Sequence, residues 1–129
     1  MEVLSSRVIL RPRDPERSRA FYRDVLGLAV YREFPGGVVF FLGQGLLELS
    51  GQGDGEASPD VALWLQVRDL DRTFHELRER GVTVLREPRR EPWGLDEMWI
   101  SDPDGVRLVL VEVPEGHPLR TDLRTDLPG

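Results

Sequence analysis

The sequence predicts an α+β fold of two tandem βαβββ modules, and two observations predict it: an internal repeat, and the strand-like runs that follow each copy. An apolar run at residues 7–11 leads into a helix start at 13–18, and the same order recurs at 62–66 and 68–73. Identical residues recur at one offset, because Arg13, Asp14 and Arg17 are matched by Arg68, Asp69 and Arg72. Self-similarity of this kind marks two copies of a unit that buries its apolar face only against a neighbour.

Each copy continues into a helix with recognisable ends. Asp14 and Asp69 are typical N-cap residues, and Pro15 stands at a first helical position, where its missing N–H costs nothing. Gly27 and Gly81 supply the C-terminal stops. We therefore expect one helix in each module.

Strand-like runs separated by turn residues follow each helix. After the first helix they occupy residues 29–34, 38–42 and 46–50. After the second helix the pattern predicts a strand at 82–85, a Pro- and Arg-rich loop at 86–92, and a hairpin of 97–101 and 106–111. The hairpin turns at Asp-Pro-Asp-Gly, residues 102–105, whose Pro and Gly suit a type I turn.

The 129 residues are enough for one domain with its own core, so we expect a single domain, 1–129. Its predicted parts are module one at about 5–51, a Gly-rich linker at 52–60, module two at about 61–113, and a C-terminal tail at 114–129. The tail repeats Leu-Arg-Thr-Asp from Leu119 onward.

Composition limits the partners and the setting. The formal net charge is −6, which disfavours nucleic acid, because phosphate contacts need clustered Lys or Arg. There are no cysteines, which excludes disulfides and thiolate metal sites and fits a cytoplasmic location. No apolar run has membrane-spanning length and the N-terminus lacks a signal-peptide pattern, so we expect no membrane partner.

Residues 13–28 and the Asp-Pro-Asp-Gly turn resemble the vicinal oxygen chelate superfamily of glyoxalases, extradiol dioxygenases and bleomycin-resistance proteins. Pro92-Trp93-Gly94, followed by Glu97 and that turn, resembles the bleomycin-resistance-like branch more closely. The resemblance implies curled sheets that form a cup-shaped cavity for the ligand, with the helices on the convex face. It also implies a homodimer, in which modules of two chains close each cup by exchange across a flexible linker.

The resemblance places the superfamily's four metal-ligand positions at Arg7, Glu48, Ala62 and Val109. Only Glu48 can ligate, because Arg keeps its proton and Ala and Val carry no donor atom. The two histidines, His75 and His117, fall on a helix and in the tail. We therefore predict no metal and no other cofactor; Glu48 would bind a metal only in a degenerate site.

Strand alternation indicates which side chains line the cup. The predicted ligand-binding residues are Arg7, Ile9, Arg11, Phe40, Glu48, Ala62, Trp64, Gln66, Trp93, Arg107 and Val109. Phe40 or its neighbour Phe41 is placed on the floor and Trp93 at the rim, whereas Trp99 is interpreted as a core or interface residue. Arg7 and Glu48 are expected to form a charge-assisted pair at the vacant metal position; the alternative is that Arg7 extends to solvent.

The predicted function is a metal-independent small-molecule binding protein, with an antibiotic among the ligands it would sequester. Two alternatives stay open: a lyase, isomerase or dioxygenase-like enzyme with Glu48 as its base, and a regulatory module whose cup is vestigial. The charge of the ligand also stays open. Glu48, Asp96 and Glu97 would suit a cation, whereas Arg7, Arg11 and Arg107 would suit a carboxylate.

Overall fold

The computed structural model describes residues 1–119, and its chain divides into two compact units. The first unit contains residues 1–58 together with 102–106, and the second contains 59–101 and the chain from 107 onward. The end of the predicted tail, 120–129, lies outside the described residues. Among the described helices, none is long and apolar enough to cross a membrane.

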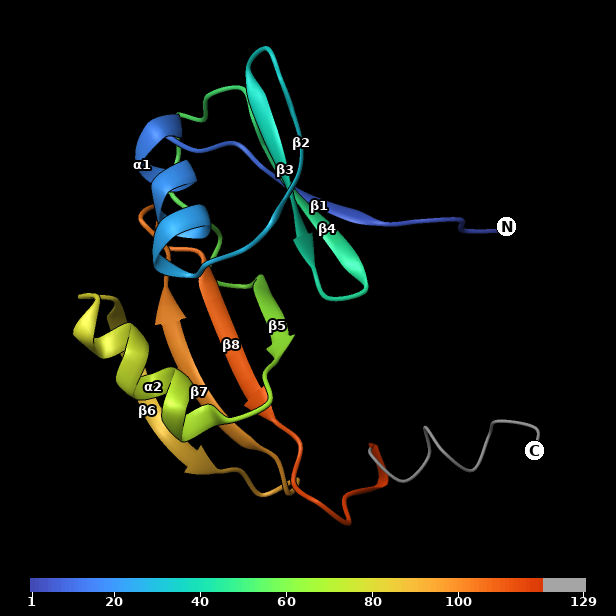
Figure 1. Ribbon diagram of the computed structural model, residues 1–129, viewed down its shortest axis with the longest axis vertical. Coiled ribbons are helices and arrows are strands. Elements are labelled where there is room, and N and C mark those ends of the chain that lie inside the picture. The colour runs from blue at the N-terminus through green and yellow to red at the C-terminus, as the bar shows by residue number, and fades with distance from the viewer. Residues whose placement is uncertain (120–129) are drawn as a thin grey trace. The chain divides into compact units, whose positions relative to one another are not determined.

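The first unit holds a mixed four-stranded sheet in the order β1-β4-β3-β2 (Figure 1). Its strands are β1 (Arg7–Leu10), β2 (Val30–Phe34), β3 (Gly37–Leu42) and β4 (Gly45–Ser50). β1 runs parallel to β4, and the other neighbours are antiparallel.

The second unit holds a sheet of the same design, in the order β5-β8-β7-β6 (Figure 1). Its strands are β5 (Ala62–Gln66), β6 (Thr83–Arg90), β7 (Asp96–Ser101) and β8 (Arg107–Glu112). The parallel pair is β5 with β8, as β1 with β4 in the first sheet. The predicted α+β fold of two tandem βαβββ modules is therefore confirmed.

The first helix begins as predicted but ends differently. In α1 (Pro15–Ala20) the Asp14 side chain accepts a hydrogen bond from the Arg17 N–H at 3.2 Å. The predicted helix then continues as a π-helical turn, η1 (Phe21–Val25), before Gly27 stops it with a φ of 73°. The wider turn lets the adjacent rings of Phe21 and Tyr22 both reach the core, where they meet edge to face at 5.1 Å.

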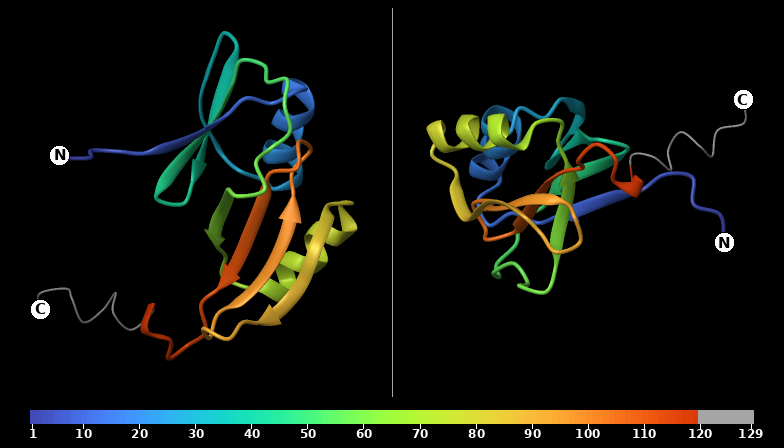
Figure 2. Two further views of the ribbon diagram at one scale, coloured as in Figure 1. Left: turned by 180° about the vertical axis from the view of Figure 1, so that it is seen from behind. Right: turned by 90° about the horizontal axis from the view of Figure 1, so that it is seen from below.

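The second helix, α2 (Leu70–Glu79), is regular and lies along one face of its sheet (Figures 1 and 2). The Asp69 side chain accepts from the Arg72 N–H at 3.0 Å, which is the predicted N-cap. Leu70, Phe74 and Leu77 are buried, as their spacing along the helix requires.

The predicted loop at 86–92 is wrong for most of its length. Strand β6 continues through Pro88 to Arg90, although Pro removes a backbone donor. The strand tolerates Pro88 because β6 is the last strand of its sheet and because its register shifts between Arg86 and Arg89. The true loop covers only the residues between β6 and β7.

The turn between β7 and β8 belongs to the first compact unit, although both strands belong to the second. Asp102 is buried there, and its carboxylate accepts from the Tyr22 hydroxyl at 2.7 Å and from the N–H groups of Asp104 and Val106 at 2.9 and 2.8 Å. Burial raises the pKa of Tyr22, and burial likewise raises the pKa of Asp102 above its ordinary value.

Candidate functional site

Each sheet has one face packed under its helix and one face left more open, and the predicted site residues divide between these faces. In β4, Leu47 and Leu49 are buried, whereas Glu48 and Ser50 are half-buried on the other side. We call this side of the first sheet the first open face; it carries Arg7, Ile9, Tyr31, Val39, Phe41, Leu46, Glu48 and Ser50. Arg7, Ile9 and Glu48 therefore share one face of the sheet, as side-chain alternation along β1 and β4 requires.

The predicted pair between Arg7 and Glu48 is present. Arg7 Nη1 donates to Glu48 Oε1 at 2.8 Å, and the Ser50 hydroxyl donates to Glu48 Oε2 at 2.7 Å. Both carboxylate oxygens are thus engaged. The Ser50 hydroxyl, followed by the Arg7 guanidinium, holds the pKa of Glu48 below its ordinary value, so this carboxylate is ionised at neutral pH.

Arg11 lies just beyond the end of β1 and is oriented by the backbone of β4. Its Nη1 donates to the Ser50 carbonyl oxygen at 3.4 Å. The Arg11 guanidinium therefore lies near the pair formed by Arg7 and Glu48, and it contributes to the low pKa of Glu48.

The aromatic part of the first open face differs from the prediction. Phe40 is fully buried and its ring lies 6.4 Å from that of Tyr22, so Phe40 packs on the helix side and does not line the open face. Its neighbour Phe41 is 47% exposed and meets Tyr31 edge to face at 5.2 Å. Tyr31 was missed because a register shift between Val30 and Arg32 interrupts the alternation of β2.

The second open face is the side of the second sheet opposite the buried Leu63 and Leu108. It carries Ala62, Trp64, Gln66, Arg86, Glu97, Trp99, Arg107, Val109 and Val111. Trp64 lies directly across from Val109 and is 50% exposed. Val111 is buried in a small cluster with Leu95 and Val113, against which Val109 packs.

Trp99 lies on this face and contacts two arginines. The guanidinium carbon of Arg86 lies 3.7 Å from the centre of the indole ring, and that of Arg107 lies 4.7 Å from it. Arg86 also pairs with the buried carboxylate of Glu91. Sequence reasoning missed Arg86, because it fell in the predicted loop. The alternation of Glu97, Trp99 and Ser101 in the predicted hairpin is the signal from which this face of the sheet could have been inferred.

Trp93 lies in the loop between β6 and β7 with its indole ring held by one side chain. Its Nε1 donates to Glu97 Oε2 at 2.7 Å, and the ring remains 58% exposed. His117 Nε2 lies 3.2 Å from the Trp93 carbonyl oxygen. The loop therefore presents an oriented aromatic side chain to solvent.

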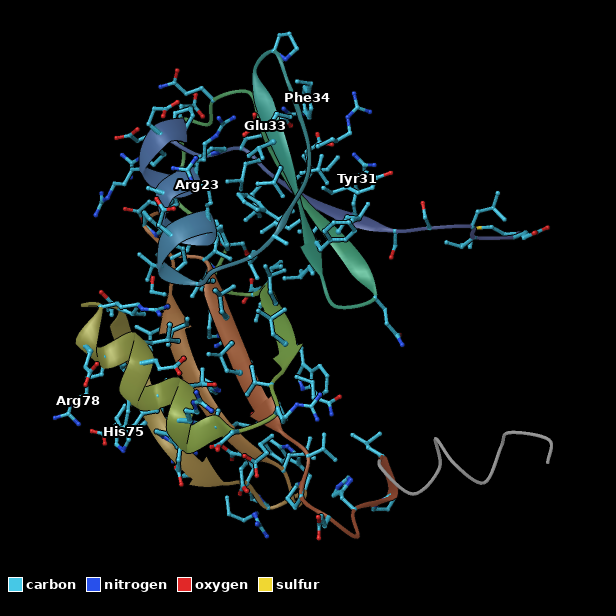
Figure 3. The ribbon with its side chains drawn as sticks, viewed as in Figure 1. Arg23, Tyr31, Glu33, Phe34, His75 and Arg78 are labelled. Carbon is cyan, nitrogen blue, oxygen red and sulfur yellow. The ribbon has the colours of Figure 1, made fainter. Side chains whose placement is uncertain are left out.

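The donor atoms do not fit the superfamily's metal. Within residues 1–119, no group of three or more His, Asp or Glu side chains is placed to hold a metal ion. Glu48, the one donor at the four expected positions, already accepts from Arg7 and Ser50. His75 is exposed on the outer side of α2, away from its sheet (Figure 3), and His117 lies beside the Trp93 loop.

A separate pocket of about 250 Å³ opens in the second unit, and none of the eleven predicted ligand-binding residues lines it. It is lined by Leu70, Asp71, Pro88, Arg89, Arg90, Asp96 and Glu112. Its polar groups serve the fold, because Arg90 pairs with Asp96 and Glu112 accepts from the Leu70 N–H at 2.8 Å.

The structure thus consists of two tandem βαβββ modules, each with a helix on one face of a four-stranded mixed sheet. The model of the Glyoxalase/Bleomycin resistance protein/Dioxygenase superfamily matches residues 5–110. The chain belongs to this superfamily, which is the vicinal oxygen chelate superfamily that its sequence resembles.

Named relatives cover most of the chain at low identity. A probable lactoylglutathione lyase of Synechocystis sp. (strain ATCC 27184 / PCC 6803 / Kazusa) is 28% identical over 125 residues, which are 81% of this chain and 91% of the relative. The uncharacterised protein YraH of Bacillus subtilis (strain 168) is 28% identical over 120 residues, 81% of this chain and 92% of YraH. The crystal structure of a superfamily member from Sphaerobacter thermophilus DSM 20745 has a TM-score of 0.71 and 26% identity, and the match covers 86% of this chain and 98% of that one.

Proposed function

We propose that this protein binds a small molecule without a metal ion. The observation that carries the proposal is the state of Glu48, whose two carboxylate oxygens accept from Arg7 at 2.8 Å and Ser50 at 2.7 Å. A metal at this position would have to displace the Arg7 guanidinium, and it would find no second side-chain donor at the other three positions. Membership of a superfamily whose members bind small molecules supports the binding role.

The two open faces supply the surfaces that such a ligand needs. Small-molecule sites usually combine apolar or aromatic walls with a few polar groups that fix orientation. Phe41 and Tyr31 give the first face its aromatic part, and Trp64 gives the second face an indole that is half exposed. The single cup predicted for these faces stays a prediction.

An enzyme of the lyase, isomerase or dioxygenase-like kind is the second candidate. The name of the Synechocystis relative, a probable lactoylglutathione lyase, is the observation that favours it. The state of Glu48 weighs against it. A general base works best when its pKa lies near the operating pH, and the Ser50 and Arg7 contacts shift the pKa of Glu48 the other way.

Sequestration of an antibiotic, a homodimeric assembly and a cytoplasmic location are finer parts of the same proposal. The resemblance of residues 92–97 to the bleomycin-resistance-like branch supports the antibiotic. Strands β1 and β5 each stand at the end of a sheet with one edge unpaired in that sheet, and an unpaired edge invites pairing with another chain. The unpaired edges of β1 and β5 support a homodimer.

Native mass spectrometry of the full chain as purified, with and without a chelator, tests the proposal. We expect subunit masses that carry no stoichiometric metal, and a retained small-molecule adduct that survives the chelator. Glu48→Gln is the matched variant, because it keeps the shape of the side chain and removes its charge. A stoichiometric metal that is lost from the wild-type chain with chelator, and is absent from Glu48→Gln, would overturn the proposal.

A further inference from the structure

The two open faces differ in how their charges are used. On the first face, the Arg7 guanidinium is matched by the Glu48 carboxylate. On the second face, Arg107 takes part in none of the ion pairs formed within residues 1–119. Arg107 therefore brings a positive charge to a half-buried position without a carboxylate beside it.

Around Trp99, hydrogen-bond donors outnumber acceptors. Three buried N–H groups lack an acceptor: Arg86 Nε, Trp99 Nε1 and Arg107 Nε. A buried donor without an acceptor is unfavourable, so a cluster of three such donors at one indole ring calls for an explanation. All three belong to the second open face, on which Val109 lies between Trp64 and Trp99.

The carboxylates that would favour a cationic ligand are already engaged. Glu48 accepts from Arg7 and Ser50, and Asp96 pairs with Arg90. Glu97 is buried and accepts from the Trp93 indole at 2.7 Å. The structure thus answers a question that residue types alone leave open, since each of these acids has a partner and Arg107 has none among the described residues.

We propose that the second open face binds the anionic oxygen group, a carboxylate or a phosphate, of a planar ligand. This inference rests on the proposed binding function and names its ligand class. Arg107 is half-buried and contributes its two terminal guanidinium nitrogens, because a guanidinium presents paired N–H donors that match two oxygens of one anion. Trp64 offers the flat surface for the ring system of the ligand.

The remaining charges of this face hold the arginines in place. Glu91 is 4% exposed and pairs with both Arg86 and Arg89. Arg86 is in turn in contact with the Trp99 ring, against which Arg107 also lies. Trp99 therefore orients Arg107 through ring contact, and Arg86 and Glu91 act as positioning residues for the Trp99 ring.

Binding of four naphthalene probes, measured by tryptophan fluorescence and calorimetry, tests the inference. The probes carry a carboxylate, a phosphate, a carboxamide or a methylammonium group at the same ring position. We expect at least one of the two anions to bind at least tenfold more tightly than the carboxamide, a difference of about 1.4 kcal/mol, and this preference to shrink at high salt. The anionic probe that binds more tightly shows whether the preferred group is a carboxylate or a phosphate.

Variants assign that preference to Arg107. Arg107→Met keeps an aliphatic chain against Trp99 and should abolish the preference for the anion while the carboxamide binds as before. Arg107→Lys should restore part of it. Arg72→Gln is the control, because it removes one positive charge from the exposed surface of α2, where Arg72 pairs with Glu76, and should change nothing.

Indole N–H signals in a ¹H–¹⁵N spectrum give an independent reading of the site. The anion should shift the signal of Trp99, whose Nε1 lacks an acceptor, and should leave that of Trp93, which donates to Glu97, in place. Tightest binding of the methylammonium probe, or an anion preference that survives Arg107→Met, would overturn the inference while leaving small-molecule binding intact. Failure of all four probes to bind would overturn it as well, whereas the proposed function is judged separately by the retained ligand and metal content.

Discussion

The two modules share a backbone plan and differ in what they do with their charges. Both sheets have the same strand order and the same parallel pair. Each helix also begins at an aspartate whose side chain accepts a hydrogen bond from the backbone N–H three residues later. The first open face matches its arginine to Glu48, whereas the second leaves Arg107 without a carboxylate among the described residues. The repeat therefore preserves the residues that build the fold, whereas the side chains of the two open faces differ.

The largest expected effect tests the shared plan in the two cores. Phe40 and Ile100 occupy corresponding positions, opposite Leu47 and Leu108, and both are fully buried. Phe40→Ala should lower the free energy of unfolding by about 3–5 kcal/mol and Ile100→Ala by about 2–5 kcal/mol, because each leaves a cavity. Urea denaturation followed by circular dichroism measures both.

Phe41→Ala is the control for this pair, since Phe41 is the exposed neighbour of Phe40. Its cost should be far smaller than that of Phe40→Ala. Equal losses at the two phenylalanines would contradict the assignment of Phe40 to the helix side of the sheet.

A smaller effect tests whether the two helix starts are equivalent. The Asp14 and Asp69 side chains accept from backbone N–H groups at 3.2 and 3.0 Å. Asp14→Ala and Asp69→Ala should each lower the free energy of unfolding by about 1 kcal/mol, as the loss of an N-cap usually does. Asp14→Asn and Asp69→Asn serve as controls that keep an accepting oxygen. A loss confined to one module would break the equivalence of the two copies at this position.

The smallest effect is a pH dependence of opposite sign at two carboxyl groups. The pKa of Glu48 is lowered in the folded chain, so its contribution to stability is present above the ordinary value of about 4.3 and is lost as the pH falls through the folded pKa. The pKa of Asp102 is raised by burial, so its contribution is fullest below the ordinary value of about 3.9 and is lost as the pH rises through the folded pKa.

Urea midpoints of wild type, Glu48→Gln and Asp102→Asn, recorded from roughly pH 3 to 7, separate the two groups. Glu48→Gln should remove part of the acid-side loss of stability, and Asp102→Asn should remove part of the loss on rising pH. Each variant keeps one accepting oxygen and replaces the other with an NH2 group, so Glu48→Gln retains one of its two side-chain partners and Asp102→Asn can still accept from the Asp104 and Val106 N–H groups. Slopes that change in the same direction in both variants would show that one of the two shifts has been assigned the wrong sign.

Residue patterns predicted the fold because its signals are local. The repeat from Asp14 to Asp69, the N-caps and the alternation of β4 each depend on a few neighbouring residues. The Arg7–Glu48 pair followed from alternation together with the strand order that the resemblance implies. The features of the site that the sequence did not predict depend on the register in which neighbouring strands pair.

Each error in the candidate site has such a cause. Phe40 and Phe41 are adjacent and both aromatic, so only the pairing of β3 with β4 decides which one faces the helix. Tyr31 lies beyond a register shift in β2. Arg86 lies in a strand that passes through Pro88, and without that strand the neighbourhood of Trp99 is invisible.

The turn from Asp102 to Gly105 links the completion of the first unit to a segment that is synthesised much later than the rest of that unit. It is counted with the first compact unit, and its Asp102 and Asp104 accept from Tyr22 and from the Arg13 N–H. A nascent chain that has emerged only as far as Ser58 still lacks these acceptors, so the first unit is completed by residues that follow much later in the sequence. Closing such distant contacts costs more chain entropy than closing local ones, so the first unit depends for these two hydrogen bonds on a turn that is far from it in the sequence.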